Sequence, residues 1–387
     1  MRTPEEFDEI RPYDADELQQ AFTELVEDPD FQDVVKMVMP DQPFDAICNK
    51  LFQCRTSLDF QKAFFYPLLK QLAETRGKGL VLDSTKISDK NTPHTFITNH
   101  RDIVLDSAFM SIALLDNGFP TTVEIAIGDN LLIKPWIRKV VRANKSFIVQ
   151  RSVNIKQMLE SSKRLSRYMH YAINTKKENI WIAQREGRAK DSNDRTQDSV
   201  LKMIAMGGEG SIIERLKDMH ITPTALSYEY DPCDYLKAQE FQQKRDFAGY
   251  KKSPQDDLLN MQTGIFGYKG GIFFKMADCL DNWLDTLDAS MPKGELIKTI
   301  ARKIDREIFL AYRLFPNNYI AADILQGERK RQQHYSEEDV TAFESYVEKQ
   351  LEKVTLKRPD FAFLKERILT MYAYPVWNQE KALKEIS

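Results

Sequence analysis

The chain has 387 residues, a formal net charge of −3, 42% hydrophobic residues and 29% charged residues. Its length predicts two or three domains, or one large domain with additions, and its apolar content allows a substantial core. The nearly balanced charge argues against a nucleic-acid partner, which would require a strongly basic surface. The acidic, polar N-terminus is unlike a signal peptide, and no apolar run approaches the roughly 18 residues of a membrane span. Four scattered cysteines without CxxC pairing predict reduced thiols and a cytoplasmic protein.

Residues 1–77 are predicted to form a helical N-terminal domain. In the segment 56–79, TSLDFQKAFFYPLLKQLAETRGKG, apolar residues such as Phe60, Phe64 and Leu68 recur at helical spacing. Pro67 is expected to kink or divide this helix.

Residues 78–290 are predicted to form an α/β domain, with a mixed, mostly parallel sheet flanked by helices. Short segments rich in β-branched and aromatic residues alternate here with helical segments, of which 155–177 is the clearest. The expected strands lie within 79–84, 94–99, 122–128, 145–151, 178–185 and 221–230. Residues 231–257 are highly charged and are expected to form a mobile connection.

Residues 291–387 are predicted to form a helical C-terminal extension. Ser336 and Asp339 stand in the spacing of a capping box at the start of one of its amphipathic helices.

The stretch NHRDIVLD, which begins at Asn99, is the first motif that carries chemistry. Read as HRD, it resembles the catalytic loop of a protein kinase. A kinase requires Asn seven residues after the His, where this chain has Ser107, and no DFG follows. The kinase interpretation therefore fails.

Four motifs in order resemble the glycerol-3-phosphate and 1-acylglycerol-3-phosphate acyltransferase superfamily. They are TFITNHRDIVLD, KSFIVQR ending at Arg151, IWIAQREGRAKD, and the proline-containing strand ITPTALSYEYDP. The third motif, together with the helical region ahead of the α/β domain, is most similar to the soluble plastid-type glycerol-3-phosphate acyltransferase. The resemblance implies a mixed sheet wrapped by helices and transfer of a fatty acyl group to a glycerol-phosphate hydroxyl.

His100 is the predicted general base of this reaction, because a neutral imidazole can remove the alcohol proton near neutral pH. A carboxylate on its other ring nitrogen would orient it. The family places four residues between its His and Asp, whereas five separate His100 from Asp106. We predict that Asp106 is the partner, with a bulge absorbing the extra residue, and Asp102 remains the alternative.

A cationic turn after the strand at 178–185 is the predicted phosphate site. Arginine binds phosphate oxygens through two parallel hydrogen bonds, and glycine lets the backbone approach closely. By resemblance, Glu186 and Gly187 hold the turn and Arg188 binds phosphate. The assisting cations are predicted to be Arg151, Arg185 and Lys190.

Residues 131–145, LLIKPWIRKVVRANK, interleave basic and apolar residues at helical spacing. Such a helix suits an anionic membrane surface. Equally, its apolar face can pack into the core or serve the acyl chain, and its basic face can attract an acidic acyl carrier protein.

Together these features predict an O-acyltransferase that uses acyl-CoA or acyl carrier protein as donor and glycerol 3-phosphate or its 1-acyl derivative (lysophosphatidate) as acceptor. The sequence shows no ligand cluster, so it implies no metal or cofactor. A lysophospholipid or an amino-acid-linked lysolipid could replace the glycerol phosphate as acceptor. Two further hypotheses are a non-catalytic lipid-binding homologue and a hydrolase, although the chain lacks the GxSxG elbow that is usual in hydrolases.

Overall fold

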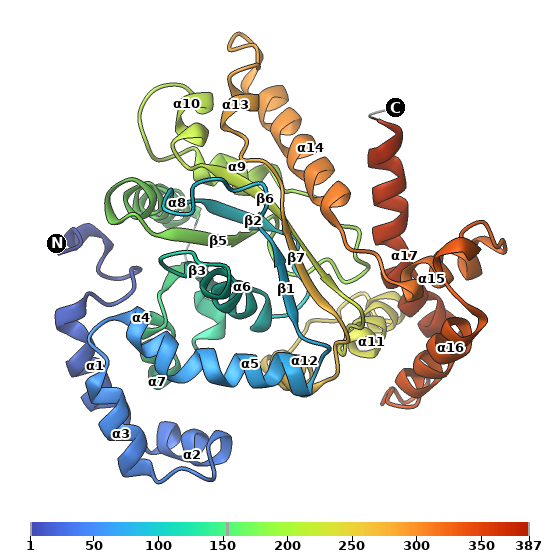
Figure 1. The fold of residues 1–387 in the computed structure, drawn as a ribbon, viewed down its shortest axis with the longest axis horizontal. Coiled ribbons are helices and arrows are strands. Elements are labelled where there is room, and N and C mark those ends of the chain that lie inside the picture. The colour runs from blue at the N-terminus through green and yellow to red at the C-terminus, as the bar shows by residue number, and fades with distance from the viewer. Residues whose placement is uncertain (1, 152–154, 386–387) are drawn as a thin grey trace.

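A computed structural model of the chain describes residues 2–151 and 155–385, and within these ranges seven strands form one sheet (Figure 1). The strand order is β1-β7-β6-β2-β5-β3-β4, and every neighbouring pair is parallel except β6 and β7. The predicted mixed, mostly parallel α/β fold is therefore confirmed. The strands are β1 (Leu80–Asp83), β2 (Thr95–Thr98), β3 (Val123–Gly128), β4 (Ser146–Val149), β5 (Asn179–Ala183), β6 (Ile221–Tyr228) and β7 (Ile272–Met276).

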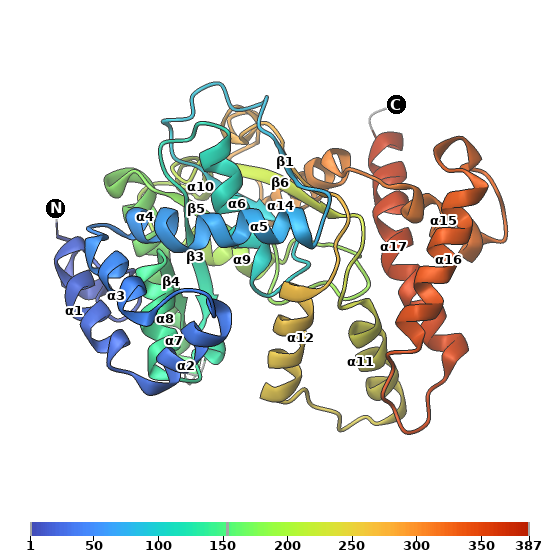
Figure 2. The same ribbon diagram turned by 60° about the horizontal axis from the view of Figure 1, so that its bottom comes forward.

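Helices cover both faces of the sheet and extend beyond it at both ends of the chain (Figures 1 and 2). The α-helices are α1 (Ala15–Val26), α2 (Pro29–Val38), α3 (Phe44–Gln53), α4 (Ser57–Phe60), α5 (Tyr66–Thr75), α6 (Leu105–Asp116), α7 (Pro135–Ala143), α8 (Ile155–Tyr171), α9 (Asp198–Ile204), α10 (Ile212–Lys217), α11 (Asp234–Asp246), α12 (Pro254–Phe266), α13 (Asp281–Leu284), α14 (Lys293–Ala311), α15 (Pro316–Gln326), α16 (Glu337–Leu351) and α17 (Phe361–Lys384). Shorter 3-10 and π-helical turns are η1 (Glu5–Phe7), η2 (Gln61–Phe65), η3 (Asp129–Leu131), η4 (Ala172–Lys176) and η5 (Gln332–His334).

Two hydrophobic layers enclose the sheet. On one face α5 and α6 pack over residues such as Phe96, Trp181 and Phe274. On the other face α8, α9 and α14 pack over residues such as Ile97 and Ile180. Because successive side chains of a strand point to opposite faces, each central strand contributes to both layers. Among the described residues, no helix combines the length and the hydropathy of a membrane span.

All six predicted strands are present, but β7 was missed. Its buried side chains alternate along Ile272, Phe274 and Met276, the period of a strand with one covered face. Phe273 is apolar on the less buried face, and Lys275 interrupts the apolar run, so the segment looks neither alternating nor continuously hydrophobic.

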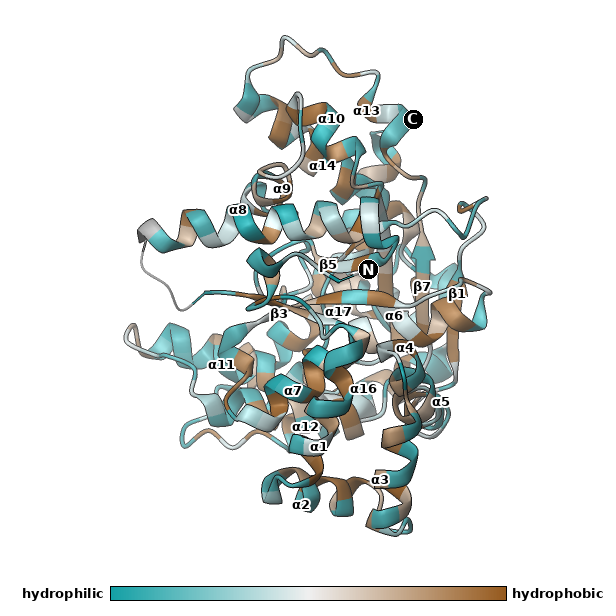
Figure 3. Cartoon of the chain, turned by 90° about the vertical axis from the view of Figure 1, so that its left-hand side faces the viewer, coloured by the Kyte–Doolittle hydropathy of each residue, from teal (hydrophilic) through white to brown (hydrophobic). Residues whose placement is uncertain are grey.

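The N-terminal helices α1, α3 and α4 share a small core with α7. Trp136 and Val140 of α7 pack against it, and Ala143 is buried in it. Figure 3 shows α7 with both hydrophobic and hydrophilic segments. Pro67 lies in the first turn of α5, directly after the π-helical turn η2, so the predicted long helix is divided next to the proline.

The basic residues of 131–145 find partners within the chain. Lys134 pairs with Asp30 at 2.8 Å and Lys139 with Glu24 at 2.9 Å. Arg142 stacks on the Tyr13 ring, with 4.2 Å between the guanidinium carbon and the ring centroid. Packing inside the molecule thus accounts for the amphipathic pattern, and the membrane contact stays a prediction.

The C-terminal helices α15, α16 and α17 form a core of their own, joined by Ala238 of α11. The predicted capping box is confirmed. The Ser336 hydroxyl accepts a hydrogen bond from the Asp339 backbone amide, and the Ser336 backbone amide donates one to the Asp339 carboxylate. Helix α14 instead packs on the sheet. The division at residues 77 and 290 stays a prediction.

The charged connection expected at 231–257 is largely helical, and its mobility stays a prediction. Helix α11 makes up about half of this stretch, and residues 254–257 are the first turn of α12, which stands beside α11 in Figure 2. Helix α11 buries polar residues, including Lys237 and Gln242, which pair with other parts of the chain. Because its buried face is polar, the helix lacks the apolar stripe by which a helix is predicted.

Candidate active site

His100 stands in the turn that links β2 to α6. Asn99, the residue before it, is fully buried. Its side chain accepts a hydrogen bond from the backbone amide of Leu226 at 2.8 Å and donates one to the backbone carbonyl of Leu226 at 2.9 Å. This pair of bonds continues the contact between β2 and β6 by one residue beyond the strand. The backbone that carries His100 is therefore held against the centre of the sheet.

The structure brings His100 and Asp106 together, with 2.7 Å between Nδ1 and a carboxylate oxygen. The buried Asp106 carboxylate also accepts from the amides of Arg101 and Asp102, at 2.6 and 3.0 Å, and from the Tyr228 hydroxyl at 3.0 Å. Residues 101–104 fold over this carboxylate before α6 begins at Leu105. The turn thus absorbs the additional residue of the His/Asp spacing.

The surroundings of the imidazole define its tautomer. An ionised carboxylate only accepts hydrogen bonds, so Nδ1 of His100 carries the hydrogen and Nε2 has the free lone pair. The Trp181 ring meets the imidazole edge to face, with 5.5 Å between the centroids. The imidazole is thereby oriented on two sides, by a carboxylate and by an aromatic ring.

Asp102 has a different task in the same turn. Its carboxylate accepts from the amides of Val104 and Leu105 at 2.8 and 2.9 Å, at the N-terminus of α6. Burial, together with the negative charge of Asp106, raises the pKa of Asp102. No hydrogen bond joins Asp102 to His100 among the described residues, so the geometry favours Asp106 as the partner.

Tyr228 completes the surroundings of Asp106 from β6. Burial, followed by the charges of Asp106 and Asp102, raises the pKa of its hydroxyl well above the ordinary value of 10. The hydroxyl therefore stays protonated and remains a hydrogen-bond donor to Asp106. Tyr228 lies in the fourth motif, but nothing in the sequence pattern singled it out.

Arg101, between the two predicted catalytic residues, forms a buried bidentate ion pair with Asp194. The two bonds measure 2.8 and 2.6 Å, and the Tyr312 hydroxyl donates to the same carboxylate at 2.5 Å. Asp194 belongs to the loop that follows the REGRAKD turn, and Tyr312 directly follows α14. This pair could not be predicted from the sequence, because the charge cluster around Asp194 looks like a solvated loop.

The cationic turn follows β5 and is exposed at its tip. Gly187 has φ 68°, a left-handed conformation in which a side chain is strained. The Glu186 amide donates to the Gln197 side chain at 2.7 Å, and the Glu186 carboxylate lies 3.3 Å from the Arg151 guanidinium. Arg151 thus reaches this turn from the end of β4. Arg185 is partly buried, and its Nε has no hydrogen-bond partner among the described residues.

Arg188 and Lys190 lie deeper in the same turn. The Nη2 atom of Arg188 donates a hydrogen bond to the Asn260 side chain at 3.1 Å. The Nη1 atom is buried without a hydrogen-bond partner in the described part of the chain. Lys190 pairs with Glu240 at 2.6 Å, and burial lowers its pKa despite this partner. Arg188 therefore has hydrogen-bonding capacity for an anion, whereas the charge of Lys190 is already compensated by Glu240.

Helix α12 connects Arg188 to the turn at residues 99–104 that carries His100, which we call the His turn. Gly264 faces the Asp102 carboxylate so closely that a Cβ atom on it would lie 2.0 Å from one oxygen. Asn260, which holds Arg188, lies four residues earlier on the same helix, and residues at this spacing share one face. One face of α12 therefore touches both predicted site segments.

Cys233 contacts helix α12 beside this region. It is buried, its sulfur donates to the Asn260 carbonyl at 3.3 Å, and burial raises its pKa to about 12. A thiol held protonated is a poor nucleophile, because the thiolate is the reactive form. The arrangement favours direct proton removal by His100 over a covalent cysteine intermediate.

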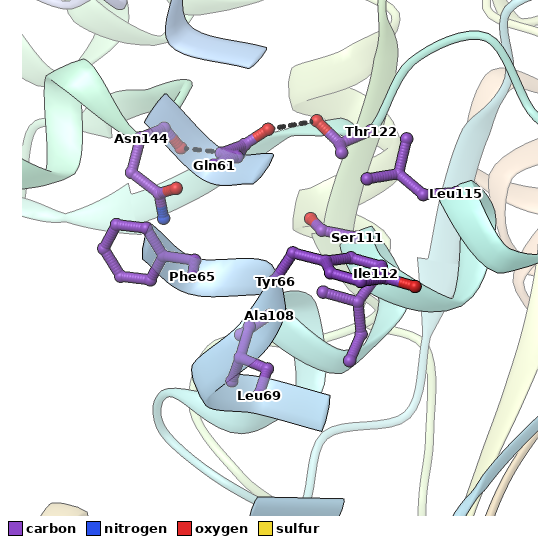
Figure 4. A pocket seen from close by; sticks show the side chains of 10 residues that line it. All are labelled: Gln61, Phe65, Tyr66, Leu69, Ala108, Ser111, Ile112, Leu115, Thr122 and Asn144. Carbon is purple, nitrogen blue, oxygen red and sulfur yellow. Dashed lines mark hydrogen bonds between the residues drawn. The ribbon is translucent and has the colours of Figure 1, made fainter. Parts of the chain in front are cut away.

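Two hollows of the described structure lie outside this site. The first, of about 20 Å³, lies between α5 and α6 and has room for about one water (Figure 4). It is lined by Ala108, Ser111 and Leu115, on the side of α6 opposite to Asp106, since each helical residue turns by about 100°. The second, of about 560 Å³, lies among the C-terminal helices. Neither hollow includes a predicted site residue.

No protein-family model matches the chain, and no curated protein matches it. Among solved structures, the chain is similar to the crystal structure of the 1-acyl-sn-glycerophosphate (LPA) acyltransferase PlsC from Thermotoga maritima. The identity is 11%, the TM-score is 0.39, and the alignment covers 75% of this chain and 93% of that one.

Proposed function

We propose that this chain is an O-acyltransferase that moves a fatty acyl group from an acyl thioester to a hydroxyl of glycerol 3-phosphate or 1-acylglycerol 3-phosphate. The observation that carries the proposal is the 2.7 Å contact between His100 Nδ1 and Asp106, which leaves Nε2 free to act as a base. The four motifs in order, and the cationic turn that α12 links to the His turn, support the same assignment.

The reaction needs one base and no covalent intermediate. His100 Nε2 removes the proton of the acceptor hydroxyl as its oxygen attacks the thioester carbonyl carbon. The tetrahedral intermediate then collapses, the carbon–sulfur bond breaks, and the imidazolium returns the proton to the departing thiolate. Asp106 stabilises the imidazolium and keeps the ring in place, and general-base action of this kind contributes about 10²–10⁴ in rate.

The phosphate of the acceptor is assigned to the turn after β5. Arg188 is its main ligand, because one of its guanidinium nitrogens is buried with no other partner in the described residues. Arg185, Lys190 and Arg151 assist, and Glu186 and Gly187 shape the turn. Glycerol 3-phosphate is the acceptor implied by the resemblance to the plastid-type enzyme, and the donor is acyl-CoA or acyl carrier protein.

The deciding experiment measures thiol release from acyl-CoA with and without glycerol 3-phosphate or lysophosphatidate. We expect release to depend on an acceptor, and His100→Ala to lower it by about 10²–10⁴. His334→Ala, an exposed histidine in η5, is the matched control and should leave the rate unchanged. Release without an acceptor would identify a hydrolase, and acyl-CoA binding without release would identify a lipid-binding protein. Activity confined to lysolipids without a glycerol-phosphate end would shift the acceptor class.

Arg188→Gln tests the phosphate assignment separately. Removal of a charge-assisted hydrogen bond worth about 1.5–3 kcal/mol should raise the acceptor KM by about 10- to 100-fold. The KM for acyl-CoA should change little, and Arg302→Gln on the exposed side of α14 serves as control. An unchanged acceptor KM would remove Arg188 from the phosphate site.

A further inference from the structure

A cluster of three different metal-binding side chains lies at the end of the sheet away from His100. A ring nitrogen of His220, Sγ of Cys279 and a carboxylate oxygen of Asp281 all lie within 4.8 Å of one another. His220 directly precedes β6, while Cys279 and Asp281 shortly follow β7. Because β6 and β7 are antiparallel, the start of one and the end of the other meet at the same end of the sheet.

The backbone fixes this meeting point. Beyond the last paired residues of β7, the Ala277 amide donates to the Pro223 carbonyl and the Leu280 amide to the Ile221 carbonyl, both at 2.9 Å. These bonds hold the segment around Cys279 and Asp281 beside the residue that follows His220. The three side chains are therefore placed by the sheet rather than by a loop of their own.

The carboxylate of Asp281 has unused capacity. One oxygen lies 2.6 Å from His220 Nδ1, and the other is buried without a hydrogen-bond partner among the described residues. Lys217 on α10 pairs with Asp285 at 2.5 Å. A His–Asp ion pair alone would leave this buried oxygen unsatisfied, whereas a bound cation would satisfy it.

We propose that His220, Cys279 and Asp281 form a binding site for Zn²⁺ that joins the start of β6 to the end of β7. One imidazole, one thiolate and one carboxylate are a ligand set that Zn²⁺ accepts and that Mg²⁺ and Ca²⁺ do not favour. Ligand atoms of a tetrahedral zinc site lie about 3.3–3.7 Å apart, given bonds of about 2.0–2.3 Å, so small side-chain rotations suffice. Binding releases the Cys279 thiol proton to solvent, and a water completes the tetrahedron.

In this proposal the site takes no part in acyl transfer. It lies at the opposite end of the sheet from His100 and needs no acceptor or acyl donor. It crosslinks the start of β6 to the segment after β7, and the loop of chain closed by this crosslink contains α11 and α12, so metal binding stabilises the folded state.

The test uses the purified full chain, freed of metal with a chelator and titrated with Zn²⁺ against a chromophoric competitor. We expect one Zn²⁺ per chain in the wild type and in Cys48→Ser, which removes a half-buried thiol elsewhere. Cys279→Ser and His220→Gln should bind at least about tenfold more weakly. Zn²⁺ should raise the Tm of the wild type and of Cys48→Ser, but not of Cys279→Ser.

Substitution with Co²⁺ gives a second readout on the wild type, independent of how any variant folds. A thiolate-to-cobalt charge-transfer absorption is expected in the near ultraviolet. Its absence, a lack of stoichiometric Zn²⁺ binding, or equal affinity in Cys279→Ser would each overturn the proposal.

Discussion

Asp106 and Asp102 lie in the same turn but have different partners, so their replacement should have different effects. Asp106→Asn removes the charge that stabilises a protonated His100 and disturbs the tautomer, and we expect kcat to fall by about 10²–10⁴. Asp102→Asn keeps an oxygen that can accept from the Val104 and Leu105 amides, so kcat should fall less than tenfold. Steady-state acyl transfer measures both; equal losses would mean that the two carboxylates share one function.

The buried pair of Arg101 and Asp194 makes a residue-scale prediction about stability. Arg101→Met leaves the Asp194 carboxylate buried, with Tyr312 as its remaining side-chain hydrogen-bond partner among the described residues, and breaking such a pair costs about 3–5 kcal/mol. Arg167→Met is the matched control, because its pair with Glu6 is exposed and is worth about 0–1 kcal/mol. Urea unfolding measures both losses. Similar values for the two variants would show that burial does not strengthen the Arg101 pair.

At the scale of elements, α12 is predicted to be sensitive to the size of one residue. Gly264→Ala would place a methyl group 2.0 Å from the Asp102 carboxylate, so α12 or the His turn has to move. We expect loss of about 1–3 kcal/mol of stability, as for overpacked sites in general, and a larger relative loss of acyl transfer.

Gly294→Ala in α14 is the control for this change. A Cβ atom there meets nothing within 4 Å, and alanine in a helix should add about 0.4–1 kcal/mol of stability. Thermal unfolding and kcat/KM would be measured for both variants. A neutral Gly264→Ala variant would show that α12 does not press on the His turn.

Local pattern predicted the elements whose buried faces are apolar. The strand segments that became β1 to β6 are bounded by turn residues and rich in β-branched side chains, so their positions could be predicted from short windows. Helix α11 could not, because buried Lys237 and Gln242 look like surface residues until their partners in distant segments are known. Where burial is polar, the local sequence does not distinguish inside from outside.

The candidate site likewise contains residues that short motifs predict and residues that only the fold brings together. His100, Asp106 and the cationic turn stand in short motifs, whereas Asp194 and Asn260 join them only through the fold. Tyr228 stands in the fourth motif, but that motif does not reveal its bond to Asp106. The cluster of His220, Cys279 and Asp281 is the extreme case, since His220 and Asp281 are 61 residues apart. Spacing rules cannot detect ligands that meet only because two strands run in opposite directions.

At the scale of the whole molecule, Asp234 connects the C-terminal helices to the rest of the chain. Its buried carboxylate accepts from the Tyr346 hydroxyl at 2.7 Å and from the Tyr372 hydroxyl at 2.9 Å, on α16 and α17. Burial, followed by the charge of Asp231, raises the pKa of Asp234 to about 7. The folded protein therefore holds a proton on Asp234 that the unfolded chain releases above about pH 4.

Because the folded state binds this proton more tightly, stability should fall as the pH rises from about 4 to 7. Between pH 5 and pH 7.5 the contribution of Asp234 should decrease by about 2 kcal/mol. Asp234→Asn removes the titrating group and should reduce this slope. Urea unfolding of both proteins at the two pH values measures it; an unchanged slope in the variant would assign the pH dependence to carboxyls elsewhere in the chain.

The Arg101–Asp194 pair also bears on which alcohols the proposed enzyme accepts. It joins the loop after the cationic turn to Arg101, the residue next to His100, so it limits how far the cationic turn and the imidazole can move apart. An alcohol one methylene longer than glycerol 3-phosphate could still seat its phosphate while its hydroxyl misses the imidazole. A displacement of about 1 Å can cost about 10²-fold in rate. The length of the acceptor alone would therefore decide which phosphorylated alcohols are acylated.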